Sequence, residues 1–403
     1  METSPSFLKE SLSRLSGYEG LQRIWDAIPS ARLVGGCVRD LLCGRAVRDV
    51  DVASPLHPHD VQERLEKIGA RVVPTGLSHG TVTAVINHQP YEITTLRRDV
   101  ETDGRHAVVV WTNSWEEDAA RRDFTINAMS IDHEGVLYDY FGGKTDLEAH
   151  KVRFVGNAES RIEEDALRSL RFFRFQARYG DEEVDPCAYA AIAEKRDLIT
   201  RLSVERVASE LLKILSGPHV GRTIRLMLSA GVLPEILPHP HVDLLEDLLK
   251  TGHPSEPLPR LYVLSGGDRS VGELLKLSNA ERSALQAFAR SEPELFLSAS
   301  DDDLRRIRAS QSLPLLVSRS WLQQARSVIG PDPQWDQWRQ RLEALPQPVF
   351  PLSGRDGLMI GLASGPQLGR WLKKAQQWWM AEGCRPDHGM CLTWLKEQVS
   401  REG

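Results

Sequence analysis

The chain has 403 residues, more than one ordinary hydrophobic core would hold, so we expect about two to four domains. Apolar residues make up 41% and charged residues 26% of it, as in ordinary globular proteins. A net charge of −6 excludes a polycation, although a local basic surface for nucleic acid is compatible with that total.

The cysteines and the apolar runs bear on the compartment. Five cysteines are scattered without a Cys-x-x-Cys pair, which argues against a disulfide framework or a zinc site and favours a reducing cytoplasm. Residues 1–10 are polar and lack the apolar run of a signal peptide. No apolar stretch approaches the roughly 20 residues of a membrane span, so we expect no membrane association.

Residues 6–28 carry apolar side chains at helical spacing, which predicts a helix. Strands then alternate with short helices up to residue 155, which predicts an α/β or α+β unit. The predicted strands are Ala31–Val34, Val50–Ala53, Arg71–Pro74, Thr81–Asn87, Glu92–Leu96, Ala107–Trp111 and Val136–Asp139. The predicted helices of this part are Val38–Leu42, His59–Ile68 and Phe124–Met129.

After residue 156 the strand signals largely stop, and Pro and Gly clusters punctuate a helical pattern. The predicted helices are Ala158–Tyr179, Pro186–Lys195, Ser203–Ser216, Gly221–Ala230 and Asp243–Leu249. The fold class we expect is therefore α+β, with a mixed-sheet head followed by a long all-helical part.

A glycine pair, Gly35-Gly36, precedes the predicted helix that begins near Cys37. Backbone N–H groups at a helix start attract phosphate, and glycine permits its close approach. Arg39, one turn into the helix, could pair with phosphate oxygens. An ordinary strand-to-helix turn is the alternative for the glycine pair taken alone.

Two acids, Asp49 and Asp51, follow this helix at the predicted strand Val50–Ala53. Residues two apart on a strand point to the same face. Like charges on a partly buried strand repel and lose hydration unless a cation joins them, so the pair predicts a Mg²⁺ site for nucleotidyl transfer. A solvated surface turn is the alternative. Glu92, on a neighbouring strand, is a candidate third carboxylate, unless it is simply exposed.

The next motif is Arg121-Arg122-Asp123-Phe124-Thr125-Ile126-Asn127, at a predicted helix start. Its arginines could bind phosphate, and Asp123 could accept a hydrogen bond from a ribose 2′-hydroxyl. A helix cap is the alternative role for Asp123.

A further motif, Glu164–Phe175, fits one long helix. One side of it carries, three residues apart, Asp165, Arg168, Arg171 and, less neatly, Arg174. Arginines in a row repel one another unless an anion lies over them, so this side predicts an anion-binding surface. Salt bridges within the helix, from Glu163, Glu164 and Asp165, are the alternative.

At these residues the chain resembles the class II CCA-adding tRNA nucleotidyltransferase and poly(A) polymerase family. The matching motifs are, in order, Gly-Gly-x-Val-Arg-Asp, Asp-x-Asp, Arg-Arg-Asp-Phe-Thr-x-Asn and Glu-Asp-x-x-Arg-x-x-Arg. The segment Phe141–Leu147 resembles the family's hinge motif, and Glu205-Arg206 with Glu210 resembles its last shared motif. The segment Arg97–His106 resembles the flexible loop associated with switching from C to A addition, with a surface loop without function as the alternative.

The resemblance implies a seahorse-like molecule. Its expected domains are a nucleotidyltransferase head (1–155), a helical neck with the nucleotide-reading helix (156–220), a helical body (221–300) and a helical, tRNA-binding tail (301–403). It implies Asp49 and Asp51 as metal ligands and catalytic carboxylates. The implied nucleotide-binding residues are Gly36 and Arg39 for the triphosphate, Arg122, Asp123 and Asn127 for phosphate and ribose, Asp165 and Arg168 for the base, and Arg171 and Arg174 in support.

The base-reading role agrees with the hydrogen-bonding groups of the bases. An Asp acceptor beside an Arg donor suits cytosine and adenine, which both present an amino group next to a ring-nitrogen acceptor. Uracil and guanine present the opposite pattern and would be rejected by about 1–3 kcal/mol.

We therefore expect template-independent addition of C, C and A to the 3′ end of tRNA from CTP and ATP, with release of pyrophosphate. A poly(A) polymerase or an A-only-adding tRNA nucleotidyltransferase of the same family is the alternative. A catalytically inactive RNA-binding protein is the alternative from a different class. The sequence implies no protein partner.

Overall fold

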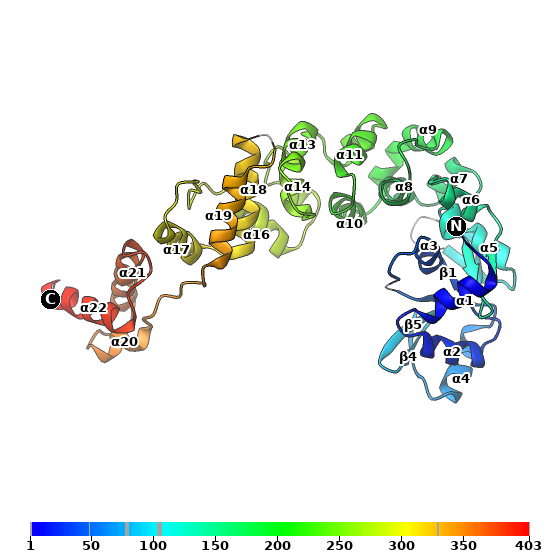
Figure 1. The fold of residues 1–403 in the computed structure, drawn as a ribbon, viewed down its shortest axis with the longest axis horizontal. Coiled ribbons are helices and arrows are strands. Elements are labelled where there is room, and N and C mark those ends of the chain that lie inside the picture. The colour runs from blue at the N-terminus through cyan, green and yellow to red at the C-terminus, as the bar shows by residue number, and fades with distance from the viewer. Residues whose placement is uncertain (1, 48, 77–79, 103–106, 329, 403) are drawn as a thin grey trace. The chain divides into compact units, whose positions relative to one another are not determined.

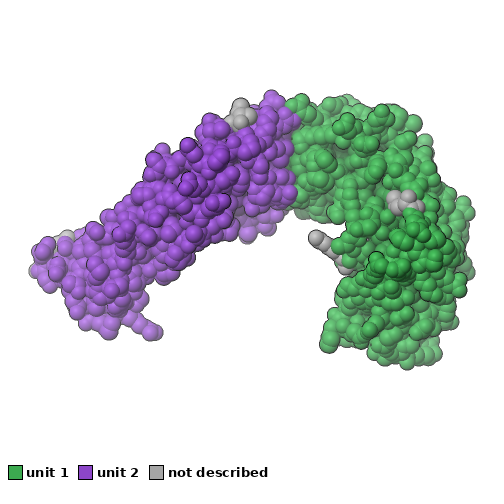
Figure 2. All heavy atoms as spheres, in the orientation of Figure 1, with its two compact units in different colours: residues 1–238 green, residues 239–403 purple. Residues whose placement is uncertain are grey.

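The structure is a computed structural model, and it describes residues 2–47, 49–76, 80–102, 107–328 and 330–402 (Figure 1). The chain divides into two compact units, residues 1–238 and 239–403 (Figure 2). The expected boundaries of head, neck, body and tail at residues 155, 220 and 300 stay predictions. Among the described residues, every helix is too short or too polar to cross a membrane.

The described part of unit 1 contains a seven-stranded mixed sheet with the strand order β3-β4-β5-β2-β1-β8-β9. Strands β2 and β5 run parallel, and the other neighbours run antiparallel. A separate two-stranded ribbon pairs β6 with β7. The strands are β1 (Arg32–Val34), β2 (Asp51–Ser54), β3 (Arg71–Gly76), β4 (Thr81–Ile86), β5 (Gln89–Thr95), β6 (Arg97–Thr102), β7 (Ala107–Trp111), β8 (Met129–Ile131) and β9 (Leu137–Asp139).

Alternation of side chains along the strands places one face of the sheet in the core. In β4 the buried residues are Val82, Ala84 and Ile86, two apart along the strand, while the residues between them are partly exposed. Helix α4 (Pro58–Lys67) packs against β3, β4 and β5 and buries Val61 and Leu65.

Helices fill the rest of unit 1. They are α1 (Pro5–Ser13), α2 (Tyr18–Ala27), α3 (Gly36–Leu42), α4, α5 (Trp115–Ala120), α6 (Gly143–Glu148), α7 (Ala158–Glu164), α8 (Leu167–Tyr179), α9 (Pro186–Glu194), α10 (Val204–Leu215), α11 (Val220–Ser229) and α12 (Val232–Ile236), with 3₁₀ turns η2 (Thr125–Asn127) and η3 (Arg196–Arg201).

Helix α8 is anchored to the sheet-bearing part by an aromatic cluster. The ring centroid of Phe124 lies 5.1 Å from those of Phe154 and Phe175 and 6.3 Å from that of Phe172. Phe124 and Phe172 are fully buried. Contacts between aromatic rings of this kind add to the burial of their large apolar surfaces, so α8 is held firmly beside the motif that contains Asp123.

Unit 2 is helical in its described residues, with one core around Trp335 and Trp338 and a second around Trp371 and Trp379. Its helices are α13 (Val242–Lys250), α14 (Pro257–Leu264), α15 (Val271–Leu274), α16 (Asn279–Phe288), α17 (Asp301–Ser310), α18 (Leu313–Ser327), α19 (Pro333–Ala344), α20 (Gly354–Met359), α21 (Pro366–Ala381) and α22 (His388–Glu402).

The expected fold class, a mixed-sheet head followed by a helical part, is confirmed, but four expected elements are wrong. The helix expected over residues 6–28 is two helices, because Gly17 between them has φ +84°, which a right-handed helix cannot accommodate. The helix expected over Ala158–Tyr179 ends at Glu164 and restarts at Leu167.

The other two errors are strands that sequence analysis missed. The expected helix Phe124–Met129 is a single 3₁₀ turn, followed by β8, which pairs with β1 and β9. The segment Arg97–Thr102, expected as part of a flexible loop, is β6 and pairs with the apolar strand β7. Residues 103–106 of that expected loop lie outside the described residues.

Candidate functional site

The glycine pair forms the turn between β1 and α3. Gly35 has φ +73° and ψ −126°, a conformation that favours glycine, and a Cβ there would lie 2.6 Å from Nη1 of Arg122. The turn therefore needs glycine for its backbone angle and for the close approach of Arg122. Helix α3 begins at Gly36 and carries Arg39, of which only 7% is exposed.

The two acids after α3 are arranged differently from the expectation. Asp51 is the first residue of β2, whereas Asp49 lies in a bend before the strand, so the prediction that both lie on one strand is wrong. Both are exposed. The parallel register of β2 and β5 places Asp51 directly opposite Glu92, which is also exposed.

The charges of Glu92 and Asp49 affect the pKa of Asp51. Loss of hydration against neighbouring protein atoms raises the pKa of Asp51, the charges of Glu92 and Asp49 raise it further, and Arg122 lowers it. A local excess of negative charge is the condition that a divalent cation relieves, and carboxylate oxygens are the ligands that Mg²⁺ prefers. The donor set of Asp49, Asp51 and Glu92 therefore fits such an ion.

A different group has its ligand atoms already close together. Among the described residues, the one set of three metal-ligating side chains with all ligand atoms within 4.8 Å is His59, Asp60 and Glu63 of α4. All three are exposed, and Glu63 already pairs with Lys67 at 2.6 Å. This group was not expected from the sequence, and the lysine that neutralises Glu63 weakens it as a metal site.

Asp123 is a buried acid with several partners. Its Oδ1 accepts hydrogen bonds from the backbone N–H of Phe124 and from Nδ2 of Asn127, each at 3.0 Å. Its Oδ2 accepts one from Nε of Arg171 at 2.7 Å. Burial by itself would raise the pKa of Asp123, but the charge of Arg171 and these hydrogen bonds outweigh it and hold the pKa below its ordinary value. Asp123 is therefore ionised at neutral pH and bound to α8.

Three of the arginines of α8, Arg168, Arg171 and Arg174, lie at the expected spacing, and each pairs with an acid of the protein. Arg168 donates to Glu164 at 2.6 Å, and Arg174 donates through Nε to Glu210 at 2.7 Å. Arg171 donates through Nε to Asp123 at 2.7 Å. Because these acids come from three separate segments, the alternative of salt bridges within one helix applies only to Arg168, and there across the break between α7 and α8.

The expected base-reading residues do not pair with each other. Asp165 lies between α7 and α8, where its Oδ1 accepts from the backbone N–H of Leu167 at 3.1 Å and its Oδ2 from Nη2 of Arg206 at 2.7 Å. Asp165 is therefore not on the helix that carries Arg168, contrary to the prediction. The two residues remain close, since the N–H of Arg168 donates to the backbone carbonyl of Asp165 at 3.0 Å.

Comparison with known proteins gives the same family along the chain. Residues 31–153 match the family described as "Poly A polymerase head domain", and residues 183–244 match "Probable RNA and SrmB- binding site of polymerase A". The chain is 35% identical over 387 residues to "CCA tRNA nucleotidyltransferase 1, mitochondrial" of Mus musculus, covering 91% of this chain and 86% of that protein. The chain belongs to the class II CCA-adding tRNA nucleotidyltransferase and poly(A) polymerase family.

Further members of the family agree in length and fold. The "CCA-adding enzyme" of Latilactobacillus sakei is 32% identical over 369 residues, covering 87% of this chain and 90% of that protein. The crystal structure of the Bacillus stearothermophilus CCA-adding enzyme in complex with CTP matches with a TM-score of 0.73 and 26% identity, covering 95% of this chain and 98% of that one. Both similarities extend over the two units of this chain.

One residue that sequence analysis missed joins the family's arginine pair. Asp118 of α5 is 3% exposed and pairs with Arg121 at 2.8 Å and with Arg122 at 3.3 Å. Burial by itself would raise the pKa of Asp118, but the two arginines outweigh it and lower the pKa. The signal was present in the sequence, since acids three and four positions before an arginine face it on a helix.

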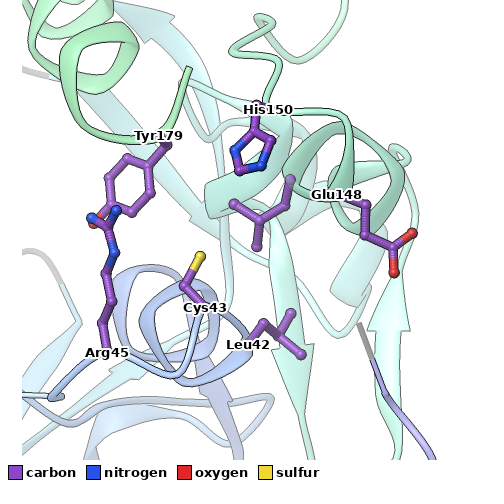
Figure 3. A pocket seen from close by; sticks show the side chains of 7 residues that line it. Leu42, Cys43, Arg45, Glu148, His150 and Tyr179 are labelled. Carbon is purple, nitrogen blue, oxygen red and sulfur yellow. The ribbon is translucent and has the colours of Figure 1, made fainter. Parts of the chain in front are cut away.

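A pocket of about 530 Å³ lies where the C-terminal ends of α3, α6 and α8 meet (Figure 3). The residues that line it are Leu42, Cys43, Arg45, Leu147, Glu148, His150 and Tyr179. None of these is a residue that the family resemblance assigns to the nucleotide. The pocket is therefore separate from the candidate site, although Tyr179 connects the two, as described below.

Proposed function

We propose that this protein adds C, C and A to the 3′ end of tRNA, using CTP and ATP without a nucleic-acid template and releasing pyrophosphate. The observation that carries the proposal is the 35% identity to a CCA tRNA nucleotidyltransferase over 91% of the chain, which includes both units. The arrangement of acids, glycine turn and arginines in unit 1 supports the same chemistry.

The proposed reaction is attack of the tRNA 3′-hydroxyl on the α-phosphate of the incoming nucleotide. Asp49 and Asp51, with Glu92 as a third ligand, would hold Mg²⁺, which supplies charge neutralisation and a lowered pKa for the attacking hydroxyl. The backbone at Gly36 and the guanidinium of Arg39 bind the triphosphate. Most of the rate then comes from positioning and electrostatic stabilisation.

The sugar is assigned to the motif that contains Asp123, and the base to the residues at the start of α8. Asp123 and Asn127 face the ribose, with Arg122 beside the phosphates. Asp165 accepts from the amino group of cytosine or adenine, and Arg168 donates to the ring nitrogen. In the structure Asp165 pairs with Arg206, and Arg168 pairs with Glu164. The incoming base therefore has to share or replace those partners. Arg171 and Arg174, on the same helix as Arg168, support the bound nucleotide.

The deciding experiment incubates the protein with a tRNA that lacks its 3′ CCA and with CTP and ATP, singly and together. The expected products are two added C residues with CTP alone and a complete CCA end with both nucleotides. Sequencing of the extended ends gives the answer directly. Extension by neither nucleotide would refute the proposal and favour an inactive RNA-binding protein.

Poly(A) polymerase is the second candidate function, because residues 31–153 match a family described by that name. Long A tails on the same tRNA would establish it. An A-only enzyme would instead extend a tRNA that ends in CC and leave one without any CCA residue unchanged.

We also propose a reducing, cytoplasmic compartment for the protein. All five of its cysteines are free in the structure, and Cys37 and Cys391 are buried. Burial of Cys37 raises its pKa to about 11, so its thiol is unreactive at neutral pH. Fractionation of the cell of origin, with detection of the protein in each fraction, tests this proposal.

A further inference from the structure

The last residue of α8, Tyr179, reaches back to α3. Tyr179 is 6% exposed, and its hydroxyl donates a hydrogen bond to Oδ1 of Asp40 at 2.6 Å, across 139 positions of sequence. Burial raises the pKa of Tyr179, and the hydrogen bond to Asp40 raises it further. The phenol therefore stays protonated at neutral pH and acts as the donor.

Asp40 in turn holds Arg39, its neighbour on α3. Its carboxylate accepts from Nε and Nη2 of Arg39, each at 3.1 Å. Successive residues on a helix do not face each other, so helix geometry alone does not favour this pair. The arginine side chain has to bend back along α3, and the hydroxyl of Tyr179 fixes the acid that it meets.

The ring of Tyr179 also covers the same guanidinium group. The guanidinium carbon of Arg39 lies 4.2 Å from the ring centroid of Tyr179 and 5.1 Å from that of Phe175. These are distances at which a cation is attracted to an aromatic ring. Nη1 of Arg39 donates to Oδ1 of Asn127, so three separate segments determine where this side chain lies.

The held guanidinium lies at the start of α3. A Cβ built on Gly36 would lie 3.5 Å from Nη2 of Arg39, which places the guanidinium directly against the glycine turn. Helix α8 carries Arg168 near its other end, eleven residues from Tyr179, which is about 16 Å along the axis. One helix therefore bears a base-reading residue at one end and the partner of the phosphate-binding arginine at the other.

We propose that Tyr179 is a positioning residue for Arg39, acting through Asp40 and through its own ring, and that it sets the position of the arginine for the nucleotide triphosphate. The inference rests on the proposed function. It assigns to the end of α8 a role in nucleotide binding beyond the packing of the helix. Arg45 also lies against this ring, with its guanidinium carbon 4.7 Å from the centroid, on the wall of the separate pocket (Figure 3).

The variant Tyr179→Phe tests this role because it removes the hydroxyl and keeps the ring and its packing. We expect KM for CTP and for ATP to rise about five- to tenfold, which lies in the upper part of the range expected for the loss of one ordinary hydrogen bond. We expect kcat and KM for tRNA to change less than about twofold, because the effect is confined to placement of the triphosphate. A change in helix packing alone would instead alter all of these quantities together.

Tyr189→Phe is the matched control. Its hydroxyl donates to the backbone carbonyl of Leu226 at 3.3 Å in the same unit, away from the candidate site, so its kinetic constants should equal those of the wild type. A second comparison places Tyr179→Phe in an Arg39→Lys background. If Tyr179 acts through Arg39, removal of the Tyr179 hydroxyl should raise nucleotide KM less than about twofold in this background. The guanidinium group that Asp40 holds is then already absent.

Three results would overturn the inference. They are an unchanged nucleotide KM in Tyr179→Phe, the same five- to tenfold rise in the Arg39→Lys background, and an equal rise in KM for tRNA. Calorimetric titration of CTP into each of these proteins, without tRNA, compares their dissociation constants for CTP in the absence of turnover. A wild-type protein that binds CTP but extends no tRNA would therefore contradict the proposed function and still leave Tyr179 testable.

Discussion

Nε of Arg171 donates a hydrogen bond to Oδ2 of Asp123 at 2.7 Å, although the two residues lie 48 positions apart. The acid is 9% exposed and belongs to the sheet-bearing part, whereas the arginine lies on α8. A buried carboxylate without a partner is costly, so this pair makes the sheet-bearing part and helix α8 depend on each other. An acid expected to bind the ribose is therefore already linked to an arginine expected to support the nucleotide.

Replacement of Arg171 by alanine should destabilise the protein by about 2 kcal/mol, since it leaves the charge of Asp123 uncompensated while the arginine itself is partly exposed. Because Arg171 holds the pKa of Asp123 low, this stabilisation is present at neutral pH and is lost as the pH falls through that lowered pKa. Urea denaturation at several pH values measures both effects.

Arg178→Ala, on an exposed position of the same helix, is the control for this variant and should change stability by less than about 0.5 kcal/mol. Equal denaturation midpoints for the two variants at neutral pH would contradict the proposed importance of the Asp123–Arg171 pair.

Asp51→Asn should abolish nucleotide incorporation and yet stabilise the protein slightly. The raised pKa of Asp51 means that the fold disfavours its ionised form at neutral pH, and this cost disappears as the pH falls through the raised pKa. The gain should be at most about 1 kcal/mol, because the residue is exposed and solvent screens its charge. Mg²⁺ should raise the melting temperature of the wild type and not that of the variant.

The matched control for the metal prediction is Asp26→Asn, an exposed acid of α2, which should retain incorporation and the response to Mg²⁺. Retained incorporation by Asp51→Asn, or an equal stabilisation of the wild type and that variant by Mg²⁺, would remove Asp51 from the metal site.

Asp165→Ala should loosen the choice of base. Under the proposed assignment one acceptor and one donor select CTP and ATP, so removal of the acceptor should reduce discrimination against UTP and GTP by about tenfold or more. Competition between correct and incorrect nucleotides for addition to one tRNA measures this discrimination. Glu163→Ala, which removes a nearby acid that pairs with Lys195, is the control. Unchanged discrimination in Asp165→Ala would exclude it from base reading.

Periodicity was sufficient to predict most of the secondary structure. The alternating apolar residues of β4 have one arrangement that buries them, and the spacing of Arg168, Arg171 and Arg174 predicts a helix, which α8 confirms. The order of the motifs likewise predicted a head followed by helices, because local patterns carry that information.

The errors have tertiary causes. Asp165, at the break between α7 and α8, pairs with Arg206, 41 residues later in the chain, and no local pattern reports such a partner. The charges of Arg97–Thr102 are typical of a loop, but pairing with β7 makes this segment a strand. The partners of Arg171 and Arg174 are long-range for the same reason, so the sequence predicted an anion over that face without identifying it as the protein's own acids.

Gly143→Ala should destabilise the hinge motif, although the residue lies at the start of a helix where alanine is normally favourable. A Cβ at Gly143 would lie 2.2 Å from the backbone carbonyl oxygen of Thr125, so α6 or the turn at Thr125 would have to move. Overpacking of this kind costs about 1–3 kcal/mol.

Gly369→Ala is the matched control, because this glycine lies within α21 with no atom within 4 Å of a new Cβ. It should stabilise its helix by about 0.5–1 kcal/mol. Urea denaturation of both variants measures the difference, and a destabilisation of the same size in both would refute the role assigned to the contact with Thr125.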